Sequence, residues 1–333
     1  MVERCAPGID RISIPIPVPL KAVNAYLCAG DDGYSIVDCG FHDDATEIHW
    51  QSVLEEIQIK PQDIKQIIVT HLHPDHYGAA GWLQQWTKAP VLMLNREAAR
   101  VRKIWHPDYA DELERLMKQH GMPADRAVAV AEEHRLRLRA VEPQPRIQSV
   151  GEGVPLQLAG HSFRPIWTPG HSDGLMVLWC PENRLLFAND MVLSDITPNI
   201  SVAPWGSPNP LKLYLQSLKE VSRLPARRTL TGHRDPVEHL AERCQEIASH
   251  HQKRLQETYE IVVREAGQLN VGAYSRSNGI TAWQVCLQLF GTYEQAVQTR
   301  FAMAETLAHL EYLVGAGSLG KEEQGGMTFY RIE

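Results

Sequence analysis

Thr70-His71-Leu72-His73-Pro74-Asp75-His76-Tyr77-Gly78 is the most informative segment of the chain, and it follows the apolar run Lys65 to Thr70. A short apolar run of this kind is typical of a buried strand. If the extended geometry persists through His73, the side chains of His71 and His73 point to the same side, because side chains alternate along a strand. Two imidazoles then converge on one point.

The turn after this strand adds two further polar side chains. Pro74 ends the strand, and the turn brings Asp75 and His76 round to face a second point close to the first. Gly78 and Gly81 keep the next helical turn slim enough for backbone to approach the site. Imidazole nitrogen and carboxylate oxygen are ligands of zinc, or of iron and manganese when carboxylates share the site. Four such residues within six positions predict a metal site.

Length and composition indicate a globular chain. It has 333 residues, of which 44% are hydrophobic and 22% charged, so a soluble protein with one enlarged domain or with an appendage is expected. The 33 basic and 40 acidic residues give a net charge of -7. A negative surface repels phosphate backbones, which disfavours nucleic acid as a partner.

The cysteines and the apolar runs indicate a cytoplasmic location. The six cysteines are isolated and form no C-x-x-C pair, so they are interpreted as reduced thiols in the cytosol. The apolar run Ile12 to Val23 is interrupted by Pro15, Pro17 and Pro19. It therefore predicts neither a signal-peptide core nor a membrane span.

Strand and helix patterns alternate through most of the chain. Short apolar runs bounded by turn residues predict strands at Ile12–Val18, Val23–Cys28, Gly33–Asp38, Lys65–Thr70, Val91–Leu94 and several positions between Ile147 and Val192. Apolar residues at helical intervals predict helices at Asp43–Ile57, Gly78–Gln85, Leu211–Val221 and Val237–Glu265. This mixture indicates an α/β or α+β sheet covered by helices.

Residues 96 to 140 have a different character. Three charged amphipathic helices are expected there with no strand between them, at Arg96–Trp105, Asp111–His120 and Asp125–Leu138. This helical insert is either a solvated structural addition or an element that lines or caps the substrate pocket. The sequence leaves both interpretations open.

The C-terminal part is expected to form a small domain of its own. The boundary is placed just before the Gly- and Ser-bearing stretch Gly272 to Gly279, which gives a catalytic domain at 1–267 and a second domain at 268–333. A helix at Ala282–Phe290, one near Tyr293–Gln298, a longer one through Met303 to Val314 and a terminal hairpin make a winged-helix shape. This tail is expected to pack against the main domain or to form a homodimer.

From about Val23 to His233 the chain resembles the metallo-β-lactamase superfamily. The histidine motif carries this resemblance together with four further segments, namely Asp38-Cys39-Gly40, Thr168-Pro169-Gly170-His171-Ser172, Ala188-Asn189-Asp190 and Thr231-Gly232-His233. The resemblance implies an α+β fold, a four-layer αββα sandwich, here with the helical insertion and the winged-helix domain. The tail is similar to the appendage of hydrolases that resemble glyoxalase II and the lactamase-β-like protein 2 group.

The resemblance also implies a dinuclear centre built from seven residues. His71, His73 and His171 would hold the first metal ion, Asp75, His76 and His233 the second, and Asp190 would bridge the two. Zinc is the expected metal, with iron or manganese as alternatives. Asp75 and Asp190 are the expected catalytic carboxylates.

The residues around these ligands have expected supporting roles. Asp38 is expected to brace a loop or a ligand, and not to bind metal itself. Asp38 and Asp235 are candidate acceptors for the ring nitrogens that do not face an ion. The other ten histidines are expected to be structural; they are His42, His49, His106, His120, His134, His161, His239, His250, His251 and His309.

The chemistry of such a centre follows from charge. Two divalent ions about 3.5–4 Å apart lower the pKa of a shared water towards neutrality and so supply a hydroxide nucleophile. The ions contribute about +4, Asp75 and Asp190 about -2 and the hydroxide about -1, which leaves about +1 to stabilise a developing oxyanion.

Members of this superfamily act on thioesters, lactones, esters and phosphodiesters, and some reduce oxygen or nitric oxide with an added flavin domain, for which this tail is too short. We expect hydrolysis of a small ester, thioester or lactone by a metal-bridging hydroxide. Aromatic residues near the insert favour an acyl substrate slightly, and these are Trp82, Trp86, Trp105 and Tyr109. β-Lactamase activity is disfavoured, because an aspartate and not a cysteine occupies position 190.

Two alternatives remain open at this stage. The first is a phosphodiesterase or endoribonuclease of the same superfamily, and the second is a regulator that binds DNA through the winged helix. The tail argues against both, because from Gly279 onward its basic residues are Arg300, Lys321 and Arg331, against six glutamates.

Overall fold

The computed structural model describes residues 2–17, 20–269 and 279–332. Two compact units are drawn from separated parts of the chain. The first unit contains Met1–His106, Arg137–Pro198 and Leu218–Cys244, and the second contains Pro107–Leu136, Asn199–Ser217 and Gln245–Glu333. Within the described residues, no helix is both long enough and apolar enough to cross a membrane.

The first unit is built around two sheets. Seven strands form the first sheet in the order of the chain, and they are β1 (Val2–Ala6), β2 (Ile9–Pro15), β3 (Ala22–Gly30), β4 (Gly33–Val37), β5 (Ile64–Val69), β6 (Val91–Leu94) and β7 (Ile147–Val150). Strands β1 to β4 pair antiparallel, whereas β4 to β7 pair parallel. The sheet is therefore mixed.

Five strands form the second sheet, in the order β12-β11-β10-β9-β8. They are β8 (Leu156–Leu158), β9 (His161–Trp167), β10 (Met176–Cys180), β11 (Leu185–Asn189) and β12 (Arg228–Thr231). The β11–β12 pair is parallel and the others are antiparallel. Strands β10 and β11 are buried along their whole length, as strands covered on both faces must be.

Side chains from both sheets form one hydrophobic core. Tyr26 of β3 packs edge-on against Phe187 of β11, with ring centroids 5.1 Å apart. Cys28 and Ile68 from the first sheet and Phe163 from the second belong to the same buried cluster. The two sheets therefore pack face to face as a sandwich, with side chains alternating between this core and the outer faces.

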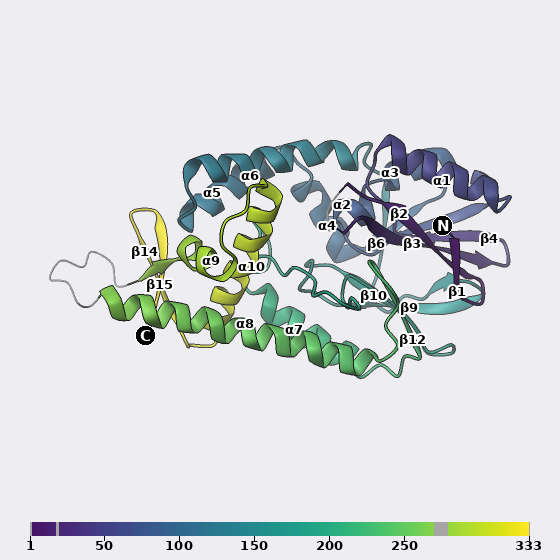
Figure 1. Ribbon diagram of the computed structural model, residues 1–333. Helices are drawn as coiled ribbons and strands as arrows, with labels where there is room; N and C mark the ends of the chain where they lie inside the picture. Colours follow the sequence, from purple (N-terminus) through teal and green to yellow (C-terminus); the bar gives the residue numbers. More distant parts are fainter. Residues whose placement is uncertain (1, 18–19, 270–278, 333) are drawn as a thin grey trace. The chain divides into compact units, whose positions relative to one another are not determined.

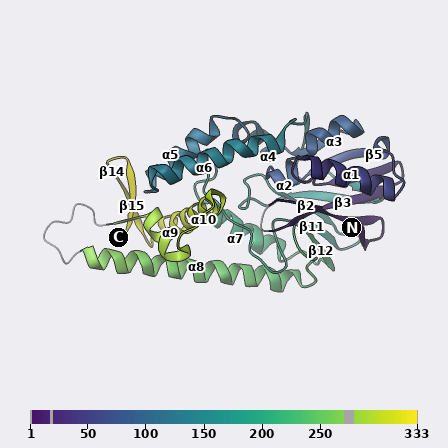
Figure 2. The ribbon, with the colours of Figure 1, turned by 45° about the horizontal axis from the view of Figure 1, so that its top comes forward.

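Helices cover the outside of this sandwich. Helices α1 (Asp44–Glu56), α3 (Ala80–Thr87) and α4 (Asn95–Ile104) contact β2, β5 and β6, and Figures 1 and 2 show them along one face of the first sheet. The ends of α7 (Pro210–Val221) and α8 (Leu240–Leu269) that belong to this unit carry the buried side chains Leu218, Val221, Leu240 and Cys244. The α+β sandwich that the sequence predicted is confirmed.

Local signals explain where these elements begin. Asp43 caps α1 by accepting a hydrogen bond from Thr46 N at 2.8 Å. Gly33, with φ +139°, closes the β3–β4 hairpin, where a Cβ would lie 2.3 Å from Asp63 O. Short helical turns complete the unit, at η1 (Pro61–Asp63), α2 (Pro74–Tyr77) and η2 (Leu138–Val141). In this unit most predicted strands and helices are confirmed to within a few residues. The strand predicted at Ile12–Val18 is β2 and ends at Pro15, and Val18 lies outside the described residues. Strand β1 is an additional strand that the sequence pattern did not indicate.

The second unit contains the remaining elements. They are α5 (Tyr109–Gln119), α6 (Ala124–Arg137), most of α7 and α8, β13 (Ile280–Thr281), α9 (Ala282–Phe290), α10 (Ala296–Gly315), β14 (Gly320–Gln324) and β15 (Met327–Arg331). Strand β15 lies between β13 and β14 in a three-stranded sheet. The prediction of two helices between Tyr293 and Val314 was wrong, because helix formers continue without a break and α10 is a single helix of 20 residues.

The helical insert is divided between the two units. Its first helix, α4, belongs to the first unit, whereas α5 and α6 pack against the C-terminal segment. Trp283 N donates to His120 O at 3.0 Å, and Arg126 donates to Tyr293 O at 3.1 Å. The C-terminal tail is thus joined to the last two insert helices.

The predicted boundary at 267/268 divides the sequence at a single point, whereas each compact unit is assembled from packed segments that are separated in the sequence. Because the second unit also recruits residues 107–136 and 199–217, the two divisions differ, and we keep the boundary at 267/268 as a proposal about the order of domains along the sequence. The Gly- and Ser-bearing stretch on which it rests lies, from residue 270 to 278, outside the described residues.

Two glycines near the start of α3 allow backbone segments to approach closely. A Cβ on Gly78 would lie 2.4 Å from Ala140 O, and a Cβ on Gly81 would lie 1.6 Å from Pro143 O. The segment that approaches is therefore the one that leads out of the insert. A Cβ on Gly78 would also lie 2.3 Å from Pro74 O and 2.9 Å from Gly40 O, in segments beside the site. The close approach of backbone beside the site is therefore found at Gly78, whereas Gly81 acts on the packing of the segment that leaves the insert.

Gly81→Ala is expected to destabilise the protein by about 1–3 kcal/mol, because the added methyl group would force Pro143 away from the helix. The same substitution in an open helix stabilises by about 1 kcal/mol. Urea unfolding measures the difference. Gly30→Ala is the control, since its Cβ would find no atom nearer than 3.4 Å; equal stability of the two variants would contradict the expectation.

Candidate metal centre

All seven predicted ligands lie in the first unit, on loops that begin at strand ends. His71 lies two residues after β5, His171 four after β9, Asp190 one after β11 and His233 two after β12. Asp75 and His76 lie on the short helix α2, for which His73 is the N-cap residue. Strands of both sheets thus deliver polar side chains to one edge of the sandwich.

The first cluster joins three histidines. His71 Nε2 lies 3.1 Å from His73 Nδ1, which lies 2.9 Å from His171 Nε2. The convergence of His71 and His73 is as expected, but its basis differs, because β5 already ends at Val69. An extended turn, with His73 at φ -62° and ψ 145°, aims the two rings at each other.

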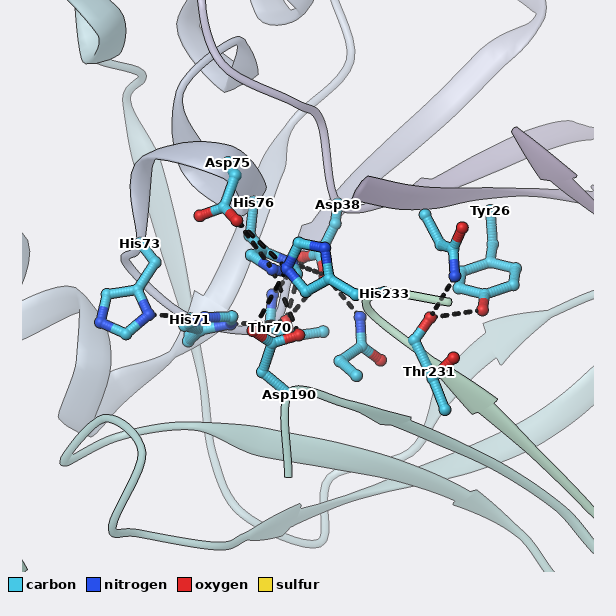
Figure 3. A network of polar contacts seen from close by, with 12 residues as sticks. Tyr26, Asp38, Thr70, His71, His73, Asp75, His76, Asp190, Thr231 and His233 are labelled. Atoms are coloured by element: carbon cyan, nitrogen blue, oxygen red, sulfur yellow. Dashed lines mark hydrogen bonds and ion pairs between the residues drawn. The ribbon is translucent and has the colours of Figure 1, made fainter. Parts of the chain in front are cut away.

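The second cluster joins Asp75, His76 and His233. Asp75 Oδ2 lies 3.2 Å from His233 Nε2 and 3.8 Å from His76 Nε2. The side chains of His76 and His233 are buried, whereas that of Asp75 is 16% exposed. Figure 3 shows the two rings and the carboxylate turned towards one another.

Asp190 lies between the two clusters. Its Oδ2 is 3.4 Å from His171 Nε2 in the first cluster and 3.5 Å from His233 Nε2 in the second. Its Oδ1 is 3.4 Å from His76 Nε2. One carboxylate therefore contacts ligand atoms of both clusters, which is the position that a bridging ligand requires.

The donor set fits metal ions. Ligands about 2.0–2.1 Å from a tetrahedral zinc ion lie about 3.3 Å from each other, and the ligand atoms of the three possible groups lie within 4.8 Å of one another. His76 Nε2 and Asp190 Oδ1 are buried without a hydrogen-bond partner among the described residues. A Cβ on Gly232 would lie 2.0 Å from Asp190 Oδ1, so a larger residue would push this carboxylate out of place.

Asp38 is the central acceptor behind the ligands. Its buried carboxylate accepts from Thr70 N at 2.8 Å, from the Thr70 hydroxyl, from His76 Nδ1 at 2.7 Å and from Asn189 Nδ2. Asp38 and Asn189 both adopt left-handed backbone, with φ +60° and +45°, a conformation that Asp and Asn tolerate better than most residues. Asp38 is thus a bracing residue, as its motif suggested.

These hydrogen bonds determine which ring nitrogen is free. Asp38 accepts the Nδ1 proton of His76, so Nε2 is the ring nitrogen of His76 that faces the cluster. The Thr70 hydroxyl donates to Asp38 and is 3.1 Å from His71 Nδ1, from which it accepts. His233 Nδ1 donates to Ala22 O at 2.8 Å. In all three histidines Nε2 is left for a ligand role.

The prediction that Asp235 accepts from a ligand histidine was wrong. The side chain of Asp235 is 87% exposed and contacts Arg11. Arg234 adopts a left-handed backbone conformation with φ +63°, and the chain turns there, so the residue two positions after His233 faces outward. The carbonyl of Ala22 provides the acceptor in its place.

Electrostatics separates the histidines into two kinds. Burial, together with neighbouring imidazoles, holds the pKa of His71 and of His73 well below the ordinary value, so both are neutral. Burial opposes the charged form of His233 as well, but the carboxylates of Asp190 and Asp75 raise its pKa to about 10. Three carboxylates, with Asp190 first, likewise outweigh burial and raise the pKa of His76. Cations are therefore favoured beside Asp75 and Asp190.

Asp38 changes the expected charge balance. It adds a third buried carboxylate to Asp75 and Asp190, in direct contact with His76. With two divalent ions and a hydroxide, the sum expected from the sequence falls from about +1 to about 0. With the ions and the hydroxide bound, the centre would be close to neutral.

The remaining predicted residues have structural environments. Trp105 and Tyr109 are buried, Trp105 donates to Leu72 O at 3.0 Å, and Trp82 stacks on Trp86 with centroids 5.0 Å apart. None of the ten other histidines belongs to a ligand group within the described ranges 2–17, 20–269 and 279–332. The sequence did not indicate Thr70, Asn189 or Glu97 as supporting residues, and only the polar character of Thr70 and Asn189 beside the ligands was a signal.

Two family models match the chain. The model described as the metallo-beta-lactamase superfamily matches residues 18–233, and the model described as the metallo-beta-lactamase-like C-terminal domain matches residues 270–332. The first match spans all seven ligand candidates and covers more than half of the chain.

Relatives and solved structures agree with these matches. A probable metallo-hydrolase of Bacillus subtilis is 24% identical over 97% of this chain and 98% of its own length. An atrochrysone carboxyl ACP thioesterase of Aspergillus fumigatus is 26% identical over 76% of this chain and 64% of its own. The crystal structure of a metallo-beta-lactamase family protein from Thermus thermophilus is 34% identical, with a TM-score of 0.84 over 99% of this chain and 100% of that one.

Asp38→Asn is expected to weaken metal binding by about 10–100-fold, because the amide cannot accept from all three donor residues and His76 loses its fixed tautomer. Asp38→Ala leaves these donors without an acceptor and is expected to lower the free energy of unfolding by about 3–5 kcal/mol. Metal titration and urea unfolding measure the two effects. Asp44→Asn, on the exposed face of α1, is the control, and an unchanged metal affinity in Asp38→Asn would contradict this role.

Proposed function

The chain belongs to the metallo-beta-lactamase superfamily and is a metal-dependent hydrolase, and on this premise we propose that it hydrolyses a small ester, thioester or lactone at a dinuclear centre. His71, His73 and His171 would hold one ion, Asp75, His76 and His233 the other, and Asp190 would bridge them. When bound, such a pair of ions, most simply zinc, supplies a water of lowered pKa as the nucleophile and polarises the scissile carbonyl.

The observation that carries this proposal is the position of Asp190. Its two oxygens contact histidines of both clusters at 3.4–3.5 Å. A mononuclear site needs no carboxylate between two complete sets of ligands. Two of the possible ligand groups, His71–His73–His171 and Asp75–His76–His233, share no residue, and this favours two ions.

The protein residues have distinct tasks in this proposal. Asp190, with a side chain only 7% exposed, contacts both ligand sets and so fixes the spacing between them. Asp75 has a side chain 16% exposed and is the carboxylate that substrate and solvent reach first, so we assign to it the acceptance of a proton during attack. Asp38 and Ala22 hold His76 and His233 in the tautomers that leave Nε2 free.

The acyl substrate class has one direct support. The Aspergillus fumigatus relative is named as an acyl carrier protein thioesterase, and thioester cleavage needs the same activated water and polarised carbonyl. The aromatic residues that first favoured an acyl substrate add little, because Trp105 and Tyr109 are buried in packing contacts.

Charge in the tail argues against nucleic acid as a partner. From Gly279 onward each of the three basic residues contacts a carboxylate, with Arg300 3.5 Å from Glu133, Lys321 2.7 Å from Glu311 and Arg331 3.1 Å from Glu322. Basic residues that are already neutralised offer little to a phosphate backbone. We propose that the tail, whether or not it is a winged helix, serves packing or homodimer formation.

The cysteines support a cytoplasmic protein. All six are free and buried, whereas an oxidising compartment favours disulfides. We therefore keep the cytoplasm as the proposed location.

The metal-reconstituted protein is expected to bind two equivalents of zinc, manganese or iron and to hydrolyse at least one member of a thioester, ester and lactone panel. Asp190→Ala is expected to lower kcat/KM by at least about 10²-fold, since it removes a ligand and not merely a partner of a ligand. Elemental analysis and steady-state kinetics measure both effects.

Asp44→Ala, an exposed carboxylate on α1, is the control for charge removal. Less than one bound equivalent, with no activity after metal addition, would contradict the proposal. Cleavage of unstructured RNA by wild type, abolished in Asp75→Ala and without acyl hydrolysis, would establish the phosphodiesterase alternative in its place.

A further inference from the structure

Glu97 on α4 is a buried carboxylate outside the seven ligand candidates. Its side chain has no exposed surface, and its Oε1 accepts hydrogen bonds from Leu72 N at 2.8 Å and from the Ser172 hydroxyl. Leu72 lies between His71 and His73, and Ser172 follows His171. One oxygen atom therefore joins the two loops that carry all three histidines of the first cluster.

The same helix holds both loops at further points. Trp105, directly after α4, donates from Nε1 to Leu72 O at 3.0 Å, so Leu72 is held at its N–H and at its carbonyl. On the other loop, Arg100 forms an ion pair with Asp173. The Arg96 guanidinium lies 4.0 Å from the ring centroid of Trp167, at the end of β9.

A glycine allows the helix to approach this closely. A Cβ on Gly174 would lie 2.4 Å from Glu97 N and 2.6 Å from both Glu97 Cα and Oε2. Because backbone atoms cannot move aside as a flexible side chain can, any larger residue at 174 would separate α4 from the His171 loop. The distance between the helix and the loop is thus set by backbone contact.

Burying a carboxylate at such a position is unfavourable in free energy, because its charge loses contact with water. Burial raises the pKa of Glu97 to about 7, although the hydrogen bonds from Ser172 and Leu72 favour its ionised form. Its Oε2 has no hydrogen-bond partner among the residues described. An apolar side chain would be easier to bury, so packing alone does not account for a glutamate here, whereas its two hydrogen bonds do.

We propose that Glu97 is a positioning residue that sets the spacing of the His71–His73 loop and the His171 loop and thereby the affinity of the first metal position. This inference rests on the dinuclear centre proposed above. The second position depends on hydrogen bonds to Asp38 and to Ala22, whereas those of Glu97 reach only Leu72 and Ser172, so Glu97 acts on one half of the centre. It acts on the ligands only through their loops.

The test compares the metal affinities of single and double variants, which are measured by chelator competition with cobalt or zinc. Asp75→Ala leaves the first position as the stronger one, and His73→Ala leaves the second. Glu97→Leu is expected to weaken binding by about 10–100-fold in the Asp75→Ala background. In the His73→Ala background it is expected to change affinity by less than about threefold, because the hydrogen bonds of Glu97 run to Leu72 and Ser172 and to none of Asp75, His76 and His233.

Three further variants separate positioning from general destabilisation. Glu97→Gln keeps an oxygen acceptor and is expected to restore most of the affinity that Glu97→Leu loses. Gly174→Ala keeps the carboxylate but displaces α4, and it is expected to reproduce the selective loss even if Glu97→Leu does not fold. Glu56→Leu, an exposed glutamate on α1, is the matched control and is expected to leave both affinities unchanged.

The outcomes distinguish this inference from the function on which it rests. Equal weakening in both backgrounds, no weakening in either, or a Glu97→Gln variant as weak as Glu97→Leu would overturn the role of Glu97 while the dinuclear centre stands. A wild-type protein that binds a single equivalent would overturn the dinuclear centre. The cobalt absorption spectrum of that single ion, altered or unaltered by Glu97→Leu, would then decide whether Glu97 positions its ligands.

Discussion

The carboxylate of Asp38 has no access to water, and the geometry of the centre depends on how its charge is satisfied. A buried carboxylate is stable only with several donors or a cation nearby. Here the donors are Thr70, His76 and Asn189, which come from separate segments of the chain. Segments that follow β4, β5 and β11 therefore close around one charge. The donation from His76 Nδ1 also fixes the orientation of the ring. The hydrogen bonds that hold the loops together therefore also turn His76 Nε2 towards the metal position.

Glu97 applies the same principle on the other side of the centre. Like Asp38, it is a fully buried carboxylate that accepts from a backbone N–H next to a ligand and from a hydroxyl group. The difference lies in what each joins, because Asp38 contacts a ligand ring directly whereas Glu97 contacts the neighbours of ligands. Asp38 reaches His76 directly and His71 through Thr70, and Glu97 reaches the loops of the first cluster. Two such buried acids would let the ligand loops be preformed before an ion enters, which is how a binding site avoids the entropy of ordering its ligands.

Local pattern was sufficient where neighbours in sequence are neighbours in space. Most strands and helices follow from apolar periodicity, and the cluster from His71 to His76 follows from residue types a few positions apart. The same pattern missed β1 and divided α10 into two helices. Prediction failed where orientation depended on distant segments. Asp235 lies two residues from a ligand but faces Arg11, and no local signal marks the left-handed turn at Arg234 as the cause. The insert looked uniform in sequence, yet its first helix and its last two pack in different units.

Short-range pattern indicated a mixed sheet covered by helices and a metal-binding cluster from His71 to His76, because apolar runs and clustered histidines are properties of short segments. The resemblance to a known superfamily supplied the sandwich and the distant ligand candidates His171, Asp190 and His233. Only the tertiary structure decided which ring nitrogens face the clusters, how near Asp190 lies to each of them, and that Glu97 joins two ligand loops through partners as distant in sequence as Ser172. These features depend on hydrogen bonds between elements far apart in the chain. Nothing in the sequence distinguishes a buried glutamate on a charged helix from an exposed one.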